Sequence, residues 1–338
     1  MRCFVAGATG FLGGYVARAL RDAGHDAVLA SRHGGNVDGM PVAALDLADE
    51  AAVETAARGS DAAYLVHGMV SRDKNDAEAL HAVHVVATER ALVALRRAGV
   101  RRVVHASTSG TLAVGTDPDA VHDESAPAPM PIIASWPYYR SKYYGEQAAL
   151  AASDPPYFEV VVVNPSLLLG PGDEHESSTG DVRRFLERAV PAIPAGGLAF
   201  VDVRDVALGM LAACERGRPG ERYLLSAKNM TLAAFFQRLE RLSGVKAPRL
   251  RLPRSHALAI GSTRLFGLAV RAIGLKSVID EVSVEMAQHY WYCDPGKAER
   301  ELGFRARDPG ETLRDTVGDI VSRKRAFPRG ALLGEVRG

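Results

Sequence analysis

The stretch RCFVAGATGFLGGYVARAL, residues 2–20, joins a short apolar run to an amphipathic pattern through a glycine-rich turn. It predicts a strand over 2–6 and a helix over 13–23. Glycines in such a turn permit close backbone approach, and the start of the helix offers free N–H groups at the positive end of its dipole. At a first strand-to-helix crossover this arrangement predicts a site for the pyrophosphate of a dinucleotide. The predicted contact residues are Gly7, Thr9, Gly10, Phe11 and Leu12.

Strand and helix patterns alternate through the residues that follow. Further strands are predicted over 27–30, 62–66, 102–106, 159–163 and 222–226, and helices over 51–57, 78–98 and 138–152. Such alternation implies right-handed crossovers and a parallel sheet, here of at least six strands, that is buried on both faces. We therefore expect an α/β fold of the Rossmann type, a doubly wound parallel sheet, with a smaller C-terminal lobe.

The C-terminal lobe is predicted to be split along the chain. After Pro165 the sequence is rich in Gly, Pro and Ser up to about residue 197, and it then returns to a strand-and-helix pattern. Residues 1–165 and 198–226 are expected to form a dinucleotide-binding domain, and residues 166–197 and 227–322 a substrate-binding lobe. Residues 256–275 are interpreted as an apolar helix of the lobe rather than a membrane-surface helix, because two arginines interrupt them. The basic tail at 323–338 is expected to be frayed.

Composition excludes several classes of protein. The 338 residues are 47% hydrophobic and 24% charged, as in an ordinary globular protein rather than a disordered one. Lys and Arg number 41 against 40 Asp and Glu, so no global field favours nucleic acid or an anionic membrane as a partner. The three cysteines lie far apart, so neither a disulfide framework nor a structural metal is expected. No membrane span is expected, and the N-terminal sequence favours a cytoplasmic location.

The end of the second strand, Ser31-Arg32, bears on the choice of nicotinamide cofactor. An acidic residue there would bind the ribose hydroxyl of NAD, whereas a basic residue accommodates the 2′-phosphate of NADP. Arg32 can pair with that phosphate and Ser31 can donate to it, so NADP is favoured and NAD remains possible. Further along the chain, Asp46-Leu47 is predicted to lie at the adenine, because a carboxylate there can accept a hydrogen bond from the adenine amino group.

Two further motifs carry polar groups suited to catalysis. Tyr138-Tyr139-Arg140-Ser141-Lys142 places a phenol and an ammonium four residues apart, on one face of the predicted helix. A nearby ammonium lowers the pKa of a tyrosine, so the phenol can exchange a proton with a substrate oxygen near neutral pH. Ser107-Thr108-Ser109 follows a strand whose carboxyl end should line the ligand crevice, so at least one hydroxyl is expected to face the cofactor. An ordinary amphipathic helix and an ordinary turn are the alternative interpretations.

Apolar side chains near these motifs predict a substrate pocket, since small-molecule sites are mostly apolar. The candidates are Met69, Val70, Ile132, Ile133, Trp136, Leu167, Leu168 and Trp291, with Ser109 beside them. The apolar candidates could equally belong to the core.

Together these motifs resemble the extended short-chain dehydrogenase/reductase superfamily, in its dihydroflavonol-reductase and 3β-hydroxysteroid-dehydrogenase-like branch. The matching segments run in the family's order along almost the whole chain. They are Gly7 to Gly13, Asp46-Leu47, Ser107-Thr108, Tyr138-x-x-Ser141-Lys142, Asn164-Pro165-Ser166, Leu169 to Gly172, Phe200 to Ala207 and Lys297 to Phe304.

The resemblance implies roles for individual residues. Tyr138 would exchange the proton, Lys142 would bind the nicotinamide ribose and lower the pKa of the tyrosine, and Thr108 would take the place of the usual catalytic serine. The residues implied to lie beside the cofactor are Val66, His67, Gly68, Tyr138, Lys142 and Pro165. A homodimer through the helices at 78–98 and 138–152 is implied as well. One departure is His84, where the family often has asparagine, and this puts the proton path in doubt.

We therefore expect an NADP-dependent oxidoreductase that moves hydride between nicotinamide and a ketone or secondary alcohol of a fairly apolar small molecule. A nucleotide-sugar epimerase with tightly bound NAD is the alternative. The basic residues that could serve it are Arg183, Arg184, Arg249, Arg251 and Arg254. Dehydration is disfavoured because Ser109-Gly110 stands where related dehydratases carry an Asp-Glu pair. A non-catalytic dinucleotide sensor is less favoured, because such proteins commonly lack the Tyr-Lys pair.

Overall fold

The computed structural model describes residues 1–253 and 281–325 and contains a large sheet and a small one. The strands of the large sheet are β1 (Arg2–Ala6), β2 (Asp26–Ser31), β3 (Gly35–Val37), β4 (Met40–Ala44), β5 (Ala62–Leu65), β6 (Arg102–Ala106), β7 (Glu159–Pro165) and β10 (Arg222–Leu225). Their order is β10-β7-β6-β5-β1-β2-β4-β3, and the pairs are parallel except for the edge hairpin of β3 and β4. This order confirms the predicted Rossmann-type sheet.

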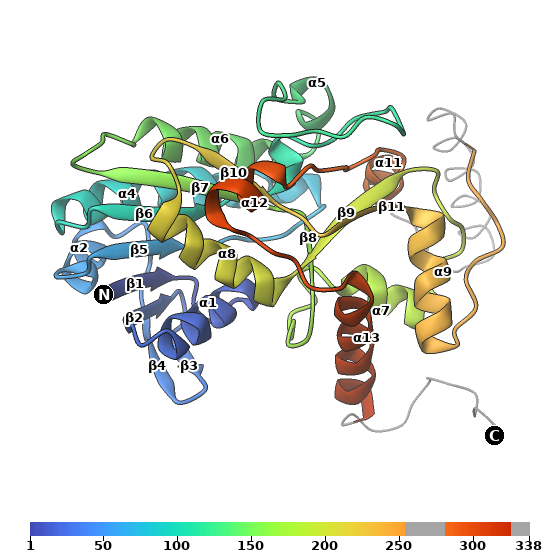
Figure 1. Ribbon diagram of the computed structural model, residues 1–338, viewed down its shortest axis with the longest axis horizontal. Helices are drawn as coiled ribbons and strands as arrows, with labels where there is room; N and C mark the ends of the chain where they lie inside the picture. Colours follow the sequence, from blue (N-terminus) through green and yellow to red (C-terminus); the bar gives the residue numbers. More distant parts are fainter. Residues whose placement is uncertain (254–280, 326–338) are drawn as a thin grey trace.

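Helices cover both faces of the large sheet (Figure 1). On one face lie α1 (Phe11–Asp22) and α8 (Val203–Arg216), and on the other α2 (Glu50–Ala57), α4 (Ala87–Arg97) and α6 (Pro137–Ala151). The first face buries Val16 of α1 and Met210 of α8, and the second buries Leu95 of α4 together with Val160 of β7. Burial on both faces explains why β7 is a continuous run of valines rather than an alternating strand.

The order of the strands places a ligand crevice. The chain runs outward from β1 through β2 to β4, and then returns to β5 on the other side of β1. In open parallel sheets, ligands bind outside the carboxyl ends of the strands at the point where the strand order reverses. The ends of β1, β5, β6 and β7 therefore frame the expected site.

The small sheet consists of β8 (Leu167–Leu169), β9 (Gly197–Asp202) and β11 (Lys228–Thr231), in the order β11-β9-β8. It packs with α7 (Gly180–Leu186), α9 (Leu232–Ser243) and α13 (Pro309–Arg325) around a separate core that includes Phe185, Phe236 and Leu313. Figure 1 shows this unit at the opposite end of the molecule from β1.

Three joins between the two sheets are very short. Ser166 alone separates β7 from β8, α8 begins directly after β9, and two residues separate β10 from β11. The predicted return to the large sheet at residue 198 is therefore wrong for one strand, because β9 pairs with β8 and β11, and the return is made by α8 and β10. A strand pattern cannot indicate which of two sheets a strand joins.

The predicted helix over 78–98 contains a π-helical turn. It is divided into α3 (Ala77–His81), the π turn η2 (Ala82–Val86) and α4. His84 lies in this turn and is buried. A π turn adds one residue to the local helix and commonly marks a functional position.

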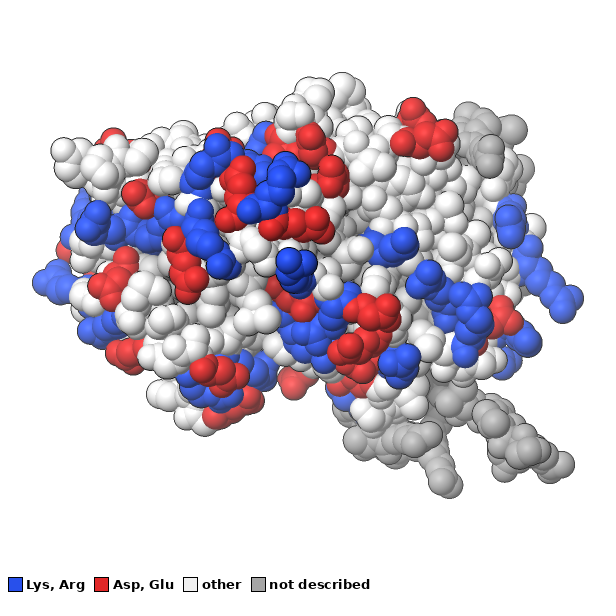
Figure 2. Space-filling model, in the orientation of Figure 1, with Lys and Arg blue, Asp and Glu red and all other residues white. Residues whose placement is uncertain are grey.

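The remaining described elements are η1 (Lys74–Asp76), η3 (Ser109–Thr111), α5 (Met130–Ile133), α11 (Glu281–Ala287) and α12 (Gly296–Leu302). The helix predicted over 256–275 and residues 326–338 of the tail lie outside the described residues. Within 1–253 and 281–325, no helix has both the length and the apolar character needed to span a bilayer. Figure 2 shows Lys and Arg interspersed with Asp and Glu around α12 and α13, and a largely uncharged area over β9 and β11.

Candidate active site

The turn between β1 and α1 is shaped for close approach to a ligand. Gly7 has a φ of +85°, and a Cβ added at Gly13 would lie 2.0 Å from the Gly7 carbonyl oxygen. Helix α1 begins after Gly10, which offers no side chain to cap the first N–H groups. A helix start that is open in this way suits an anionic phosphate. The residues present therefore fit the pyrophosphate of a dinucleotide, with Thr9 beside Gly35 on the neighbouring hairpin.

The end of β2 differs from expectation at one residue. Ser31 is buried and its hydroxyl donates to the Gly34 carbonyl oxygen (3.1 Å), so its predicted role as a phosphate donor is not supported by this geometry. Arg32 is exposed, and no hydrogen bond or ion pair within the described residues engages it. Asp46 is exposed and accepts from Ala48 N–H (2.9 Å), and Leu47 is half-buried against the core.

Helix α6 places Tyr138 and Lys142 at the carboxyl ends of β5 and β6. The Lys142 ammonium donates to the carbonyl oxygen of Ala106, the last residue of β6 (3.1 Å). Lys142 is 7% exposed, and burial lowers its pKa to about 8. Burial raises the pKa of the Tyr138 phenol, so at neutral pH the phenol holds a proton that it can donate. The predicted helical face thus brings both groups to the crevice.

The segment after β5 runs beside Lys142. Val66 N–H donates to the Ala6 carbonyl oxygen (3.0 Å). This hydrogen bond continues the pairing of β5 with β1 one residue beyond the end of β5. A Cβ at Gly68 would lie 3.4 Å from the Lys142 ammonium. His67 contacts Thr88 Oγ1 through Nε2 (3.1 Å), and burial, together with the Lys142 charge, lowers the pKa of His67 to about 3.

His84 connects the loop after β5 to the start of α6. Met69 N–H donates to its Nε2 (3.1 Å), so the neutral ring carries its proton on Nδ1. That proton is donated to Ser141 Oγ (2.8 Å), which in turn donates to the Tyr138 carbonyl oxygen (2.9 Å). Burial and the Lys142 charge lower the pKa of His84 to about 2. Both ring nitrogens are engaged, so His84 links the loop after β5 to the start of α6.

The three hydroxyls after β6 differ in their partners. Ser107 Oγ donates to Glu146 Oε2 (2.5 Å), and Ser109 is buried. Thr108 is more exposed, and its Oγ1 makes only a long contact with Gly110 N–H (3.4 Å) among the described residues. All three line the same cavity as Tyr138. Thr108 therefore has the hydroxyl that is best placed to meet a ligand.

Behind these hydroxyls lies a carboxylate that the sequence reasoning did not identify. Glu146 Oε2 accepts from Ser107, from Thr111 Oγ1 (2.7 Å) and from Asn164 Nδ2 (2.7 Å), and Oε1 accepts from Arg222 (3.2 Å). Its position four residues after Lys142, on the same helical face, was a usable signal.

A cavity of about 520 Å³ opens between the two sheets at this point. Thr108, Tyr138 and Pro165 line it, as do the predicted pocket residues Ser109, Trp136 and Leu168. Of the other apolar candidates Val70, Leu167 and Trp291 line it, whereas Ile132 and Ile133 pack around Trp136 in the core. Met69 is not among the lining residues, and its backbone N–H donates to His84 Nε2.

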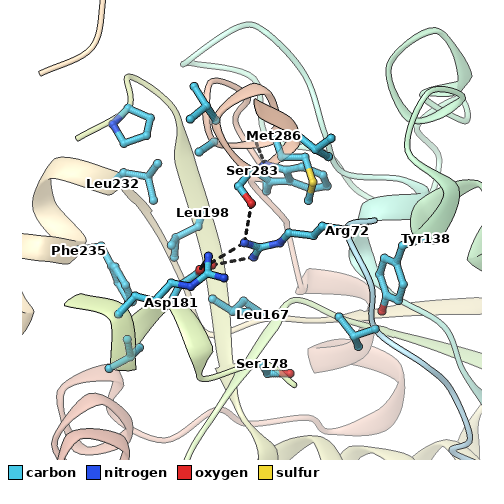
Figure 3. Close-up of a pocket in the computed structure, with 18 of the residues that line it drawn as sticks. Arg72, Tyr138, Leu167, Ser178, Asp181, Leu198, Leu232, Phe235, Ser283 and Met286 are labelled. Atoms are coloured by element: carbon cyan, nitrogen blue, oxygen red, sulfur yellow. Dashed lines mark hydrogen bonds and ion pairs between the residues drawn. The ribbon is translucent and has the colours of Figure 1, made fainter. Parts of the chain in front are cut away.

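The cavity walls combine apolar side chains with an ion pair. Arg72 donates to both carboxylate oxygens of Asp181 (2.8 and 3.3 Å) and to Ser283 Oγ (3.0 Å). Burial raises the pKa of Asp181, but the Arg72 guanidinium outweighs it and holds that pKa below its ordinary value. In Figure 3 this pair is drawn between Tyr138 and the apolar end marked by Leu198, Leu232 and Phe235.

The arginines suggested for a sugar diphosphate do not gather in this cavity. Arg184 lines it, but Arg183 pairs with Glu176 and Glu187. Arg249 and Arg251 are exposed and are not lining residues, and Arg254 lies outside the described residues.

Comparison with known proteins agrees with this geometry. Residues 3–226 match the NAD dependent epimerase/dehydratase family. A provisional dihydroflavonol 4-reductase of Synechocystis sp. is 33% identical over 94% of this chain and 93% of its own. A 2-alkyl-3-oxoalkanoate reductase of Stenotrophomonas maltophilia is 32% identical over 90% of this chain and 94% of its own. The crystal structure of gox2253 is 26% identical, with a TM-score of 0.79 over 96% of this chain and 98% of that one.

Proposed function

Because the chain belongs to the NAD-dependent epimerase/dehydratase family and is an NAD(P)-dependent enzyme of the extended short-chain dehydrogenase/reductase type, we propose that it reduces a ketone of a fairly apolar small molecule with NADPH. The reverse oxidation of the secondary alcohol is the same reaction. The large sheet would hold the dinucleotide, and the small sheet with its helices would hold the substrate.

One observation carries this proposal. Tyr138, Thr108 and Pro165 line the same cavity as a wall of apolar side chains. Trp136 stacks on Trp291 with ring centroids 5.6 Å apart. The ring centroids of Tyr139 and Trp291 are 4.8 Å apart. A proton donor at one end of a largely apolar cavity suits an apolar carbonyl compound. The reductase name of the Stenotrophomonas relative agrees with a ketone as substrate.

The residues of the chain divide the chemistry among them. Bound nicotinamide would supply the hydride that reaches the carbonyl carbon. Tyr138 would donate its phenolic proton to the carbonyl oxygen, and Thr108 would donate a hydrogen bond to the same oxygen. Lys142 would hold positive charge next to the phenol, so that the tyrosinate left after proton transfer is stabilised. The turn at Gly7–Gly13, the end of β5 and Pro165 would hold the dinucleotide.

Arg32 is proposed to select NADPH through its 2′-phosphate. Titration calorimetry of wild type and Arg32→Ala should show a loss of roughly 10- to 100-fold in NADPH affinity, with NADH affinity unchanged, because one charge-assisted pair is removed. Arg241→Ala, an exposed arginine on α9, is the matched control. Preference of the wild type for NADH, or purified protein that already carries NAD, would overturn the assignment and make nucleotide sugars the first substrates to test.

A homodimer is proposed through α4 and α6, which pack side by side. Val93 on α4 is 43% exposed and Tyr144 on α6 is 45% exposed, so these helices present apolar surface on the outside of the molecule. Sedimentation equilibrium should give twice the chain mass for the wild type. Val93→Glu should shift the protein toward monomer, since it would bury a charge in the interface. A monomeric wild type would contradict the proposed assembly.

A further inference from the structure

Glu146 is a fully buried carboxylate on α6, behind the cavity. There it meets β7, β10, η3 and the end of β6. It is 0% exposed, and it receives its hydrogen bonds from the end of β6, from η3, from β7 and from β10. Arg222, with 23% of its side chain exposed, supplies the opposite charge. A buried carboxylate is tolerated only when it is paired and fully hydrogen-bonded, and Glu146 meets both conditions.

The donors to Glu146 surround Thr108 in the chain and in space. Ser107 precedes Thr108 directly, and Thr111 closes the 3₁₀ turn that Thr108 begins. Asn164 Nδ2, which donates to Glu146, also lies within hydrogen-bond distance of the Thr108 carbonyl oxygen (3.1 Å) and of Thr111 Oγ1 (3.0 Å). One carboxylate oxygen therefore fixes the backbone on both sides of the Thr108 hydroxyl.

We propose, resting on the function proposed above, that Glu146 is a positioning residue for the reduction and holds the Ser107–Thr111 turn so that the Thr108 hydroxyl faces the substrate oxygen beside Tyr138. Glu146 does not line the cavity, so it acts through the residues that it binds. A misplacement of about 1 Å in a reacting group can cost about 100-fold in rate, which makes such support necessary.

The same carboxylate also acts on Lys142 through its charge. The titratable groups that interact with Lys142 are His67 after β5, His84 in η2, His105 on β6, and Glu146 on its own helix. The three histidines are neutral because burial and the Lys142 charge lower their pKa values, and Tyr138 is neutral as well. Burial lowers the pKa of Lys142 and the Glu146 charge raises it, with a result of about 8.

Glu146→Gln tests both consequences, because it keeps the shape of the side chain and removes its charge. Lys142 is a cation below its pKa, so wild-type activity should fall as the pH rises through about 8. In the variant this alkaline limb should move down by about one pH unit. The value of kcat at neutral pH should fall roughly 10- to 100-fold. The pH at which NADPH affinity declines, measured by calorimetry without substrate, should move in the same direction.

Two further variants make the test decisive. Glu54→Gln, in an exposed pair on α2, should leave the kcat and both pH profiles as in the wild type. Thr111→Val keeps the charge and removes one donor, so it should lower kcat several-fold with no change in the alkaline limb. If Glu146→Gln does not fold, Thr111→Val decides: wild-type kcat overturns the proposal.

The outcomes separate this proposal from the proposed function. If Glu146→Gln leaves both the kcat at neutral pH and the alkaline limb as in the wild type, the role of Glu146 is overturned whichever ketone is reduced. If the wild type reduces no ketone, the proposed function fails. The calorimetric profile of Glu146→Gln then still shows whether the carboxylate acts on Lys142.

Discussion

Tyr138→Phe is expected to lower kcat for ketone reduction by roughly 10²- to 10⁴-fold, the usual contribution of a positioned proton donor. The substitution removes one hydroxyl and leaves the ring contacts of Tyr138 with His84 and Tyr139 available. NADPH affinity should change little, because Gly7–Gly13 and Lys142 remain. Stopped-flow measurement of NADPH oxidation at neutral pH, together with calorimetric NADPH binding, separates the chemical step from binding.

Tyr157→Phe is the matched control, since it makes the same chemical change at a side chain that is 78% exposed. Its turnover should equal that of the wild type. If Tyr138→Phe retains more than about a tenth of wild-type kcat, a different group donates the proton and the proposed mechanism is wrong.

Gly13→Ala should have the largest effect on the dinucleotide site. The new Cβ would lie 2.0 Å from the Gly7 carbonyl oxygen and 2.8 Å from its carbon, and both are backbone atoms that cannot rotate away. The turn must therefore open, which distorts the phosphate site and costs roughly 1–3 kcal/mol of stability. We expect NADPH affinity to fall at least about tenfold and the midpoint of thermal unfolding to fall by several degrees.

Gly318→Ala on α13 is the control for this glycine. A Cβ there meets nothing within 4 Å, and the residue is exposed within the helix. Alanine should stabilise the protein by roughly 0.5–1 kcal/mol and leave NADPH binding unchanged. Wild-type affinity in Gly13→Ala would show that the turn does not hold the dinucleotide.

The sequence predicts best those elements whose structure depends on residues close together in the chain. The turn after β1 needs glycine for steric reasons that can be read from its spacing, and the valines of β7 reflect burial on both faces of a sheet. The Tyr138–Lys142 spacing placed both side chains on one helical face, and the structure brings them to the same crevice.

The sequence did not reveal contacts where a residue had more than one possible partner. Ser31 binds its own loop, and Met69 contributes a backbone N–H, so their residue types did not reveal their contacts. Asn164 and Glu146 lie 18 residues apart, and they meet only because β7 and α6 are brought together by the sheet. Convergence of this kind depends on tertiary structure.

The three short joins between the sheets have a thermodynamic consequence. Domain closure requires a few residues that absorb large changes in φ and ψ, and Ser166, the β9–α8 junction and the two residues after β10 leave little chain for such changes. Short joins hold the cavity wall of the small sheet in a fixed position relative to Tyr138. Substrate binding should therefore cost little conformational entropy. Changes in substrate scope should therefore come from replacing wall side chains on a rigid frame, and small-angle scattering should give the same radius of gyration with and without ligand.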